Sequence, residues 1–156
     1  MRSHLSDLAF LLLRLTGIAM AVYHGQGKVA SLASGEGERL IQGAADLGFP
    51  LPIVFAWAAA LSELVGALLI AIGLGTRIAA GFLAFTMAVA AFGRHHAFQQ
   101  ILVALGAMSV DAETLKGWGK PESALIYMAV YLALILTGPG RYSIDFLIAK
   151  RRRSSN

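Results

Sequence analysis

Long apolar runs separated by short polar stretches dominate the chain. The runs cover residues 5–23, 52–74, 76–95 and 122–137. A helix needs roughly 20 apolar residues to cross the hydrocarbon core of a bilayer, so three runs have about the full length and the fourth is short. The turn between the second and third runs is too short to hold structure of its own, which makes these helices antiparallel neighbours. The pattern predicts an all-α, antiparallel four-helix membrane bundle.

Two stretches between the runs predict shorter helices. Residues 36–47 place apolar side chains such as Leu40 and Leu47 at helical spacing, which favours an amphipathic helix at the membrane interface. Residues 97–110 are apolar but too short to span a bilayer. We interpret them as a re-entrant piece, an interfacial piece or an extension of the third helix. Both stretches fall in loops that we expect on the outer side of the membrane.

The composition supports a membrane protein. Of the 156 residues, 57% are apolar and only 14% are charged, which is too hydrophobic for a soluble domain of this size. No loop is long enough for a second folded unit, so we expect one domain over residues 1–149. The sequence contains no cysteine. Thiolate chemistry is therefore excluded, and redox chemistry would need a bound cofactor, a metal on nitrogen and oxygen ligands, or a partner protein.

The charge pattern predicts the orientation of the bundle. The net charge of +4 comes mostly from a basic tail at residues 150–156. Next to a membrane segment such a tail indicates an anchor on anionic lipid, and nucleic acid is not expected as a partner. If both termini are cytoplasmic, more Lys and Arg residues lie inside than outside, as topology rules favour. The inner ones are Arg2, Arg77, Arg141, Lys150, Arg151, Arg152 and Arg153, and the outer ones are Lys28, Arg39, Arg94, Lys116 and Lys120.

The first apolar run carries polar residues along one helical face. Residues at steps of three or four along this face are Arg14, Gly17, Ala21, His24 and Lys28. A cation in hydrocarbon is costly, so Arg14 is expected to face the protein interior and a partner. The second run contains a single charge, Glu63, close to its centre and among small residues that let helices approach closely. We expect Arg14 and Glu63 to form an internal ion pair.

The predicted topology brings distant polar residues to one end of the bundle. Polar groups at the outer ends of the spans would surround a shaft that leads down to Arg14 and Glu63. Such a shaft suits an amphipathic ring molecule, because His, Lys and Tyr donate hydrogen bonds to quinone oxygens and a His–Glu pair can carry protons. We predict a quinone as cofactor, with catalytic roles for Glu63 and His24. The predicted ligand-contacting residues are Arg14, Lys28, His95, Tyr127 and Glu122.

Two other roles are open for these residues. Arg14 and Glu63 could form a purely structural ion pair that fixes the register of the helices. His24, His95 and Glu63 could instead ligate zinc, copper or non-haem iron, because imidazole and carboxylate suit these metals. No short ligand motif supports that alternative, so no metal is predicted.

Six short motifs lie in order along nearly the whole chain. They are Leu13-Arg14-Leu15, His24-Gly25-x-x-Lys28, Leu47-Gly48-x-Pro50-x-Pro52, Glu63-x-x-Gly66, Gly73-Leu74-x-Thr76-Arg77 and Gly138-Pro139-Gly140-Arg141-Tyr142-Ser143-x-Asp145. In this order and spacing they resemble the DoxX family. The resemblance implies a four-helix integral protein of the bacterial or archaeal cytoplasmic membrane. Relatives in that family include the membrane subunit of a thiosulfate:quinone oxidoreductase.

The resemblance also implies a set of family-like polar residues. By position these are Arg14, His24, Lys28, Glu63, Arg77, His95 and Glu122. Residues 97–120 are longer than the usual connection in the family, which would reshape the outer mouth of the cavity.

We therefore expect an integral membrane component of a quinone-linked redox or oxidative-stress system, with a ligand cavity open to the outer face. The chain has no cysteine, haem motif or nucleotide motif, so it is not expected to be a complete oxidoreductase, and a soluble redox partner protein is predicted. Whether it catalyses a reaction by itself is left open. The alternatives are a non-enzymatic scaffold for a partner protein and a small transporter, since small-residue helix faces also support homo-oligomers.

Overall fold

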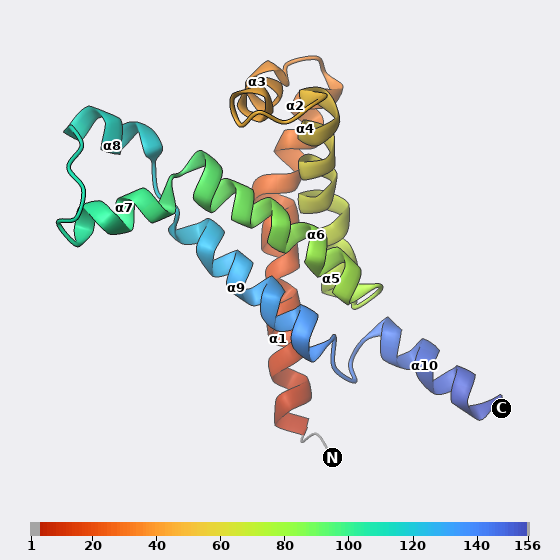
Figure 1. The fold of residues 1–156 in the computed structure, drawn as a ribbon. Coiled ribbons are helices and arrows are strands. Elements are labelled where there is room, and N and C mark those ends of the chain that lie inside the picture. Colours follow the sequence, from red (N-terminus) through yellow and green to blue (C-terminus); the bar gives the residue numbers. More distant parts are fainter. Residues whose placement is uncertain (1–3, 156) are drawn as a thin grey trace.

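The computed structural model describes residues 4–155, and within them all regular elements are helices (Figure 1). Arg2, which entered the charge count, lies outside the described residues. Four stretches are long and apolar enough to cross a membrane, as the sequence predicts. They are His4–Ala33, Pro52–Ile72, Thr76–Arg94 and Ala112–Thr137. The protein is thus a multi-pass membrane protein with an all-α, four-helix architecture.

The first span is longer than its apolar run. It consists of α1 (His4–Met20), the π-helical turn η1 (Ala21–Gly25) and α2 (Gln26–Ala33), which follow one another without a break. Gly25 keeps helical dihedral angles, φ −67° and ψ −49°. The expected end at residue 23 was therefore too early, because tertiary contacts of the helix outweigh the modest cost of glycine inside it.

The second and third spans also contain π-helical turns. The second comprises α4 (Pro52–Leu61), η2 (Ser62–Gly66) and α5 (Ala67–Ile72), and the third comprises α6 (Thr76–Ala88) and η3 (Val89–Arg94). Proline suits the first turn of α4, where its missing N–H would have no partner anyway. Gly73 and Gly75 both adopt positive φ, which permits the tight turn between the two spans.

Within residues 4–155, the remaining helices include α8 and α9, which belong to the fourth span, and three helices outside the spans. They are α3 (Glu38–Asp46), α7 (Ala97–Ala104), α8 (Ala112–Trp118), α9 (Glu122–Thr137) and α10 (Ile144–Ser154). His96 has a left-handed conformation, φ 51°, so the chain turns before α7 and residues 97–110 do not extend the third helix. Figure 1 shows α7 and α8 standing to one side of the bundle. Two hydrogen bonds from Thr114 to the carboxylate of Asp111 cap α8 and lower the pKa of Asp111.

The four spans pack as two helix pairs. α1 lies against α5, and α6 runs side by side with α9 (Figure 1). Small residues permit the closest approaches: a Cβ added to Gly17 would collide with the backbone carbonyl of Ala67. In lipid, where the hydrophobic drive between helices is absent, such close van der Waals packing is a main source of association energy.

The first turns of α1 and the segment between α9 and α10 lie together at one end of the bundle, which we call the terminal end (Figure 1). The opposite end, with α3 and α7, is the loop end. At the terminal end the buried Asp7 accepts a hydrogen bond from the backbone N–H of Arg141 at 3.1 Å, and its carboxylate lies 3.5 Å from Nε of Arg141. The buried Arg14 donates a hydrogen bond to the backbone carbonyl of Tyr142. These contacts join the first helix to the segment that follows α9.

Asp145 connects the same segment to the turn before α6. Its carboxylate accepts hydrogen bonds from the backbone N–H groups of Gly75 at 2.8 Å and Thr76 at 3.0 Å, which are among the unpaired donors at the helix start. Its own N–H donates to the carbonyl of Gly73 at 2.9 Å. We call Asp7, Arg14, Arg141, Tyr142 and Asp145 the terminal lock. The motif at residues 138–145 thus binds the motif at residues 73–77.

We predict that Gly25→Ala lowers the free energy of unfolding by about 1–3 kcal/mol, as overpacking typically does. A Cβ at this position would lie 2.5 Å from the carbonyl oxygen of Glu63, where only backbone atoms could move. Gly27→Ala is the matched control, because a Cβ there meets nothing within 4 Å. Thermal unfolding in detergent should show Gly27→Ala neutral or slightly stabilised. Equal effects of the two changes would contradict the close helix contact.

We predict that Asp145→Ala lowers the free energy of unfolding by about 0.5–2 kcal/mol, the usual cost of losing a helix cap. Asp111→Ala is the control, since it removes a comparable cap, the bond from the N–H of Thr114 at 2.8 Å, from the peripheral helix α8. Only the first change should lower the unfolding temperature of the bundle. If the two variants melt alike, the terminal lock does not hold the spans together.

Candidate functional site

A buried ion pair lies in the middle of the second span. Glu63 belongs to η2 and is only 1% exposed. Nζ of Lys28, on α2, donates a hydrogen bond to Oε1 of Glu63 at 2.7 Å. The short distance and opposite charges make this a strong, charge-assisted bond. The side chain of Lys28 is 35% exposed, so the pair reaches from the protein interior towards its surface.

The close contact between η1 and η2 positions this pair. Gly25 lies directly against the backbone of Glu63, and its missing Cβ leaves room for that contact. Lys28 follows Gly25 by about one helical turn, so its long side chain can extend past the contact to the carboxylate. The π-helical turns at these positions fit a general tendency, since such turns are often found at functional sites.

The expected ion pair between Arg14 and Glu63 is not formed. Arg14 lies at the terminal end, where its guanidinium packs against Gly73 and faces the charge of Asp145. Residues 14 and 28 are about 21 Å apart along the continuous first helix, and Glu63 and Gly73 are about 15 Å apart along the second. Because the two helices are antiparallel, Arg14 meets the end of the second span and Lys28 meets its middle.

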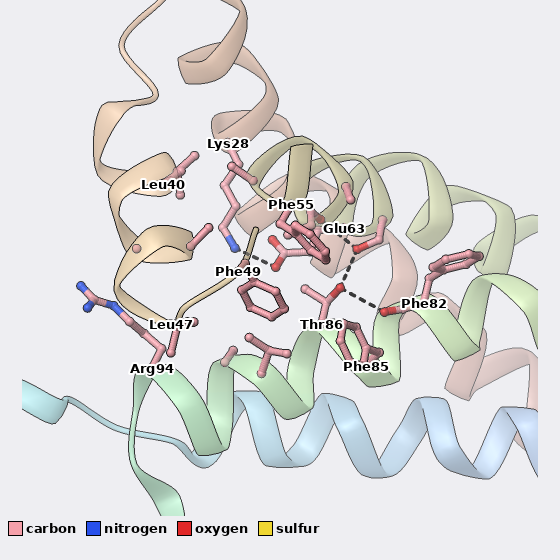
Figure 2. Close-up of a pocket in the computed structure, with 18 of the residues that line it drawn as sticks. Lys28, Leu40, Leu47, Phe49, Phe55, Glu63, Phe82, Phe85, Thr86 and Arg94 are labelled. Carbon is pink, nitrogen blue, oxygen red and sulfur yellow. Dashed lines mark hydrogen bonds and ion pairs between the residues drawn. The ribbon is translucent and has the colours of Figure 1, made fainter. Parts of the chain in front are cut away.

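A pocket of about 340 Å³ lies beside the ion pair (Figure 2). Its walls come from α3, from α4 and η2, and from α6 and η3. The mainly apolar lining includes four aromatic residues, Phe49, Phe55, Phe82 and Phe85. The polar residues of the lining are Lys28, Arg39, Ser62, Glu63, Thr86 and Arg94. Both the volume and the mainly apolar lining with a few polar groups are typical of small-molecule sites.

The polar groups of the pocket differ in their freedom to bind a ligand. The hydroxyls of Ser62 and Thr86 lie 3.0 Å apart, and each also lies within hydrogen-bond distance of a backbone carbonyl of its own helix, so one hydroxyl donates to the other and the other donates to its carbonyl. Oε2 of Glu63 is buried and has no hydrogen-bond partner within residues 4–155. Chemically, the pair therefore offers an ammonium donor and a carboxylate oxygen that can accept a hydrogen bond or a proton.

The structure divides the other predicted site residues among separate places. His24 is exposed, and its ring meets the ring of Tyr127 edge to face at 6.0 Å, outside the pocket lining. Nδ1 of His95 lies 2.8 Å from the backbone carbonyl of Trp118, in the connection to α8. Glu122 is exposed at the start of α9. Of the predicted set, only Lys28 and Glu63 lie together in the pocket.

Sequence reasoning missed the aromatic lining and the two arginines of the pocket, Arg39 and Arg94. The amphipathic pattern of residues 36–47 was visible, but nothing in it showed that α3 packs against α4 and closes one side of a pocket.

The alternative of a metal site requires that the ligand side chains lie close together. Within the described chain, no three His, Asp or Glu side chains are grouped as a metal ion would require, so His24, His95 and Glu63 do not form a ligand set.

Comparison with known proteins gives one match. The family model described as DoxX matches residues 9–96, which is more than half of the chain and extends from α1 to the end of η3. This confirms the resemblance that the sequence motifs indicate. The matched region contains the ion pair and every residue of the pocket lining. No curated protein and no solved structure matches the chain.

We predict that Lys28→Met lowers the free energy of unfolding by about 1.5–3 kcal/mol, because it leaves the buried carboxylate of Glu63 without its charged donor. The double variant Lys28→Met/Glu63→Gln should be more stable than Lys28→Met alone, since the uncompensated charge is then removed. Lys116→Met, at an exposed position on α8, is the control and should be neutral. Additive effects of the two changes at the pair would show that Lys28 and Glu63 are not coupled.

Proposed function

The chain belongs to the DoxX family of membrane proteins, and we propose that it binds a quinone-like ligand in the pocket beside Lys28 and Glu63. In this proposal it is the membrane component of a quinone-linked redox system. The observation that carries the proposal is the ion pair in the lining of a mainly apolar pocket with four phenylalanines, with one carboxylate oxygen of Glu63 free of partners among the described residues.

The walls of the pocket support a ligand that arrives from the lipid. Phe82 and Phe85 on α6 line the pocket and are 65% and 58% exposed, on a helix that spans the membrane. A ring molecule dissolved in the bilayer could reach the pocket past these side chains without leaving an apolar environment. Stacking on phenylalanine rings favours a flat aromatic or quinonoid ring over an aliphatic chain alone.

The ion pair supplies the chemistry that a quinone carbonyl requires. Reduction of a quinone adds electrons and protons to its oxygens, so the oxygen becomes a stronger hydrogen-bond acceptor as the reaction proceeds. Lys28 can donate a hydrogen bond to that oxygen. Glu63 can take up a proton from solvent and pass it to the oxygen, which returns Glu63 to its carboxylate form. The electrons would come from a partner protein, because the sequence has no cysteine or cofactor motif for an electron carrier of its own.

The orientation of the bundle is part of the same proposal. Arg77, Arg141 and the basic end of α10 belong to the terminal end, and by the positive-inside rule these charges support a cytoplasmic location for that end. The ligand pocket then lies towards the outer face of a bacterial or archaeal cytoplasmic membrane. A redox partner outside the cell membrane would meet the loop end of the protein.

One observation favours a second candidate, a scaffold for a partner protein. On α7, which stands away from the bundle (Figure 1), Phe98 and Ile101 are 59% and 50% exposed, and Leu105, the residue directly after the helix, is 76% exposed. Exposed apolar side chains on a projecting helix are typical of a protein or membrane contact surface. A partner that still binds after the pocket residues are changed would support this candidate.

We predict that ubiquinone and menaquinone analogues with short tails bind the protein in lipid nanodiscs, measured by calorimetry or by quenching of tryptophan fluorescence. Lys28→Met and Glu63→Gln should each weaken binding about tenfold, the effect of losing one good polar contact. Glu122→Gln is the matched control, because this exposed carboxylate lies outside the pocket lining and should not change the affinity.

Two results would count against the quinone proposal. One is the absence of saturable binding to the wild-type protein. The other is equal affinity in wild type, Lys28→Met and Glu63→Gln, which would place the ligand away from the ion pair.

A further inference from the structure

An aromatic series from α9 and η1 lies outside the pocket and leads towards Glu63. The ring of His24 meets the ring of Tyr127 at 6.0 Å with an interplanar angle of 80°, and Tyr127 stacks on Tyr131 at 6.0 Å and 19°. The two tyrosines are four residues apart on α9, so they occupy successive turns of one helix face. None of the three residues lines the pocket, and the proposed quinone chemistry does not use them.

Tyr131 is the innermost member of this series. It is fully buried, and its hydroxyl has no hydrogen-bond partner within residues 4–155. The same holds for Oε2 of Glu63. A buried hydroxyl or carboxylate oxygen without a partner is costly, and the great majority of such groups in folded proteins are paired with protein or with an internal water.

The two unpartnered groups lie in the same region of the core. Tyr131 packs in one cluster with Ala21 and Ala67, which sit about one turn from Gly25 and Glu63 respectively. The charge of Glu63 also acts electrostatically on Tyr131. A phenolic hydroxyl donates one hydrogen bond and an ionised carboxylate only accepts, so the two groups are chemically complementary.

We propose that the hydroxyl of Tyr131 and the free carboxylate oxygen of Glu63 belong to one hydrogen-bonded unit, joined through one internal water. Lys28 then holds one oxygen of the carboxylate and Tyr131 holds the other through the water. Tyr131 is a positioning residue in this arrangement, because it acts on the ligand only through Glu63.

The test is Tyr131→Phe in ligand-free protein in nanodiscs, since this change removes only the hydroxyl. If the hydroxyl is joined to Glu63 through the water, its loss should lower the unfolding temperature by about 2–4 °C. It should also shift the infrared carboxylate band of Glu63, which is assigned by comparison with Glu63→Gln. In a double-variant cycle, Tyr131→Phe should cost less stability in the Glu63→Gln background than in wild type. Tyr23→Phe, at a residue that is 80% exposed, is the control and should change neither measurement.

An unchanged or raised unfolding temperature together with an unchanged carboxylate band would overturn the inference, because removal of a truly unpaired buried hydroxyl is neutral or stabilising. The result is independent of the quinone assay. If the protein binds quinone but Tyr131→Phe does not shift the carboxylate band, the Tyr131–Glu63 unit is wrong and the quinone proposal stands. If Tyr131→Phe shifts the band but the protein binds no quinone, the quinone proposal is wrong and the Tyr131–Glu63 unit stands. The quinone affinity of Tyr131→Phe should stay within about twofold of wild type, since Tyr131 does not line the pocket.

Discussion

The accommodation of one carboxylate, that of Glu63, inside an apolar helix bundle is the constraint on which the rest of the structure depends. A charged group loses its hydration there and needs an opposite charge and hydrogen bonds at short range. Lys28 supplies the charge at 2.7 Å because the first helix continues without a break beyond Gly25. Gly25 supplies the room, since any larger residue would push the two helices apart and move the donor away.

The two cations of the first helix have separate tasks. Arg14 belongs to the terminal lock, where it donates to the backbone of Tyr142 and holds the chain ends against the spans. Lys28 belongs to the pocket, where its partner is a carboxylate whose second oxygen has no hydrogen-bond partner among residues 4–155. The rigid helix between them separates the two by about 21 Å. The terminal lock can therefore hold one end of the bundle while the pocket beside Lys28 and Glu63 keeps a polar group that a ligand can contact.

The pocket forms because the connection between the first and second spans, which contains α3, folds back on the bundle. α3 packs against α4, and together with α6 and η3 it encloses an aromatic space beside the ion pair (Figure 2). The same connection carries Arg39 to the pocket wall, while Arg94 ends the third span there. Tyr131, outside the pocket lining, is buried in the core, and its hydroxyl also lacks a partner among the described residues. Glu63 is thus the point where a ligand pocket and a buried polar core meet.

The sequence by itself determined the membrane class, the four apolar spans, the amphipathic helix near residues 36–47 and the family, because each depends on composition or on spacing within a short stretch of chain. It also singled out Lys28 and Glu63, since charges in apolar runs are conspicuous. Only the tertiary structure decided that Lys28, and not Arg14, pairs with Glu63. Pairing depends on the relative heights of two helices, which are set by where each helix ends and by the contacts of Gly17 and Gly25 with residues far away in the sequence. Membrane insertion is a local property of each segment, whereas the geometry of a site comes from packing between segments.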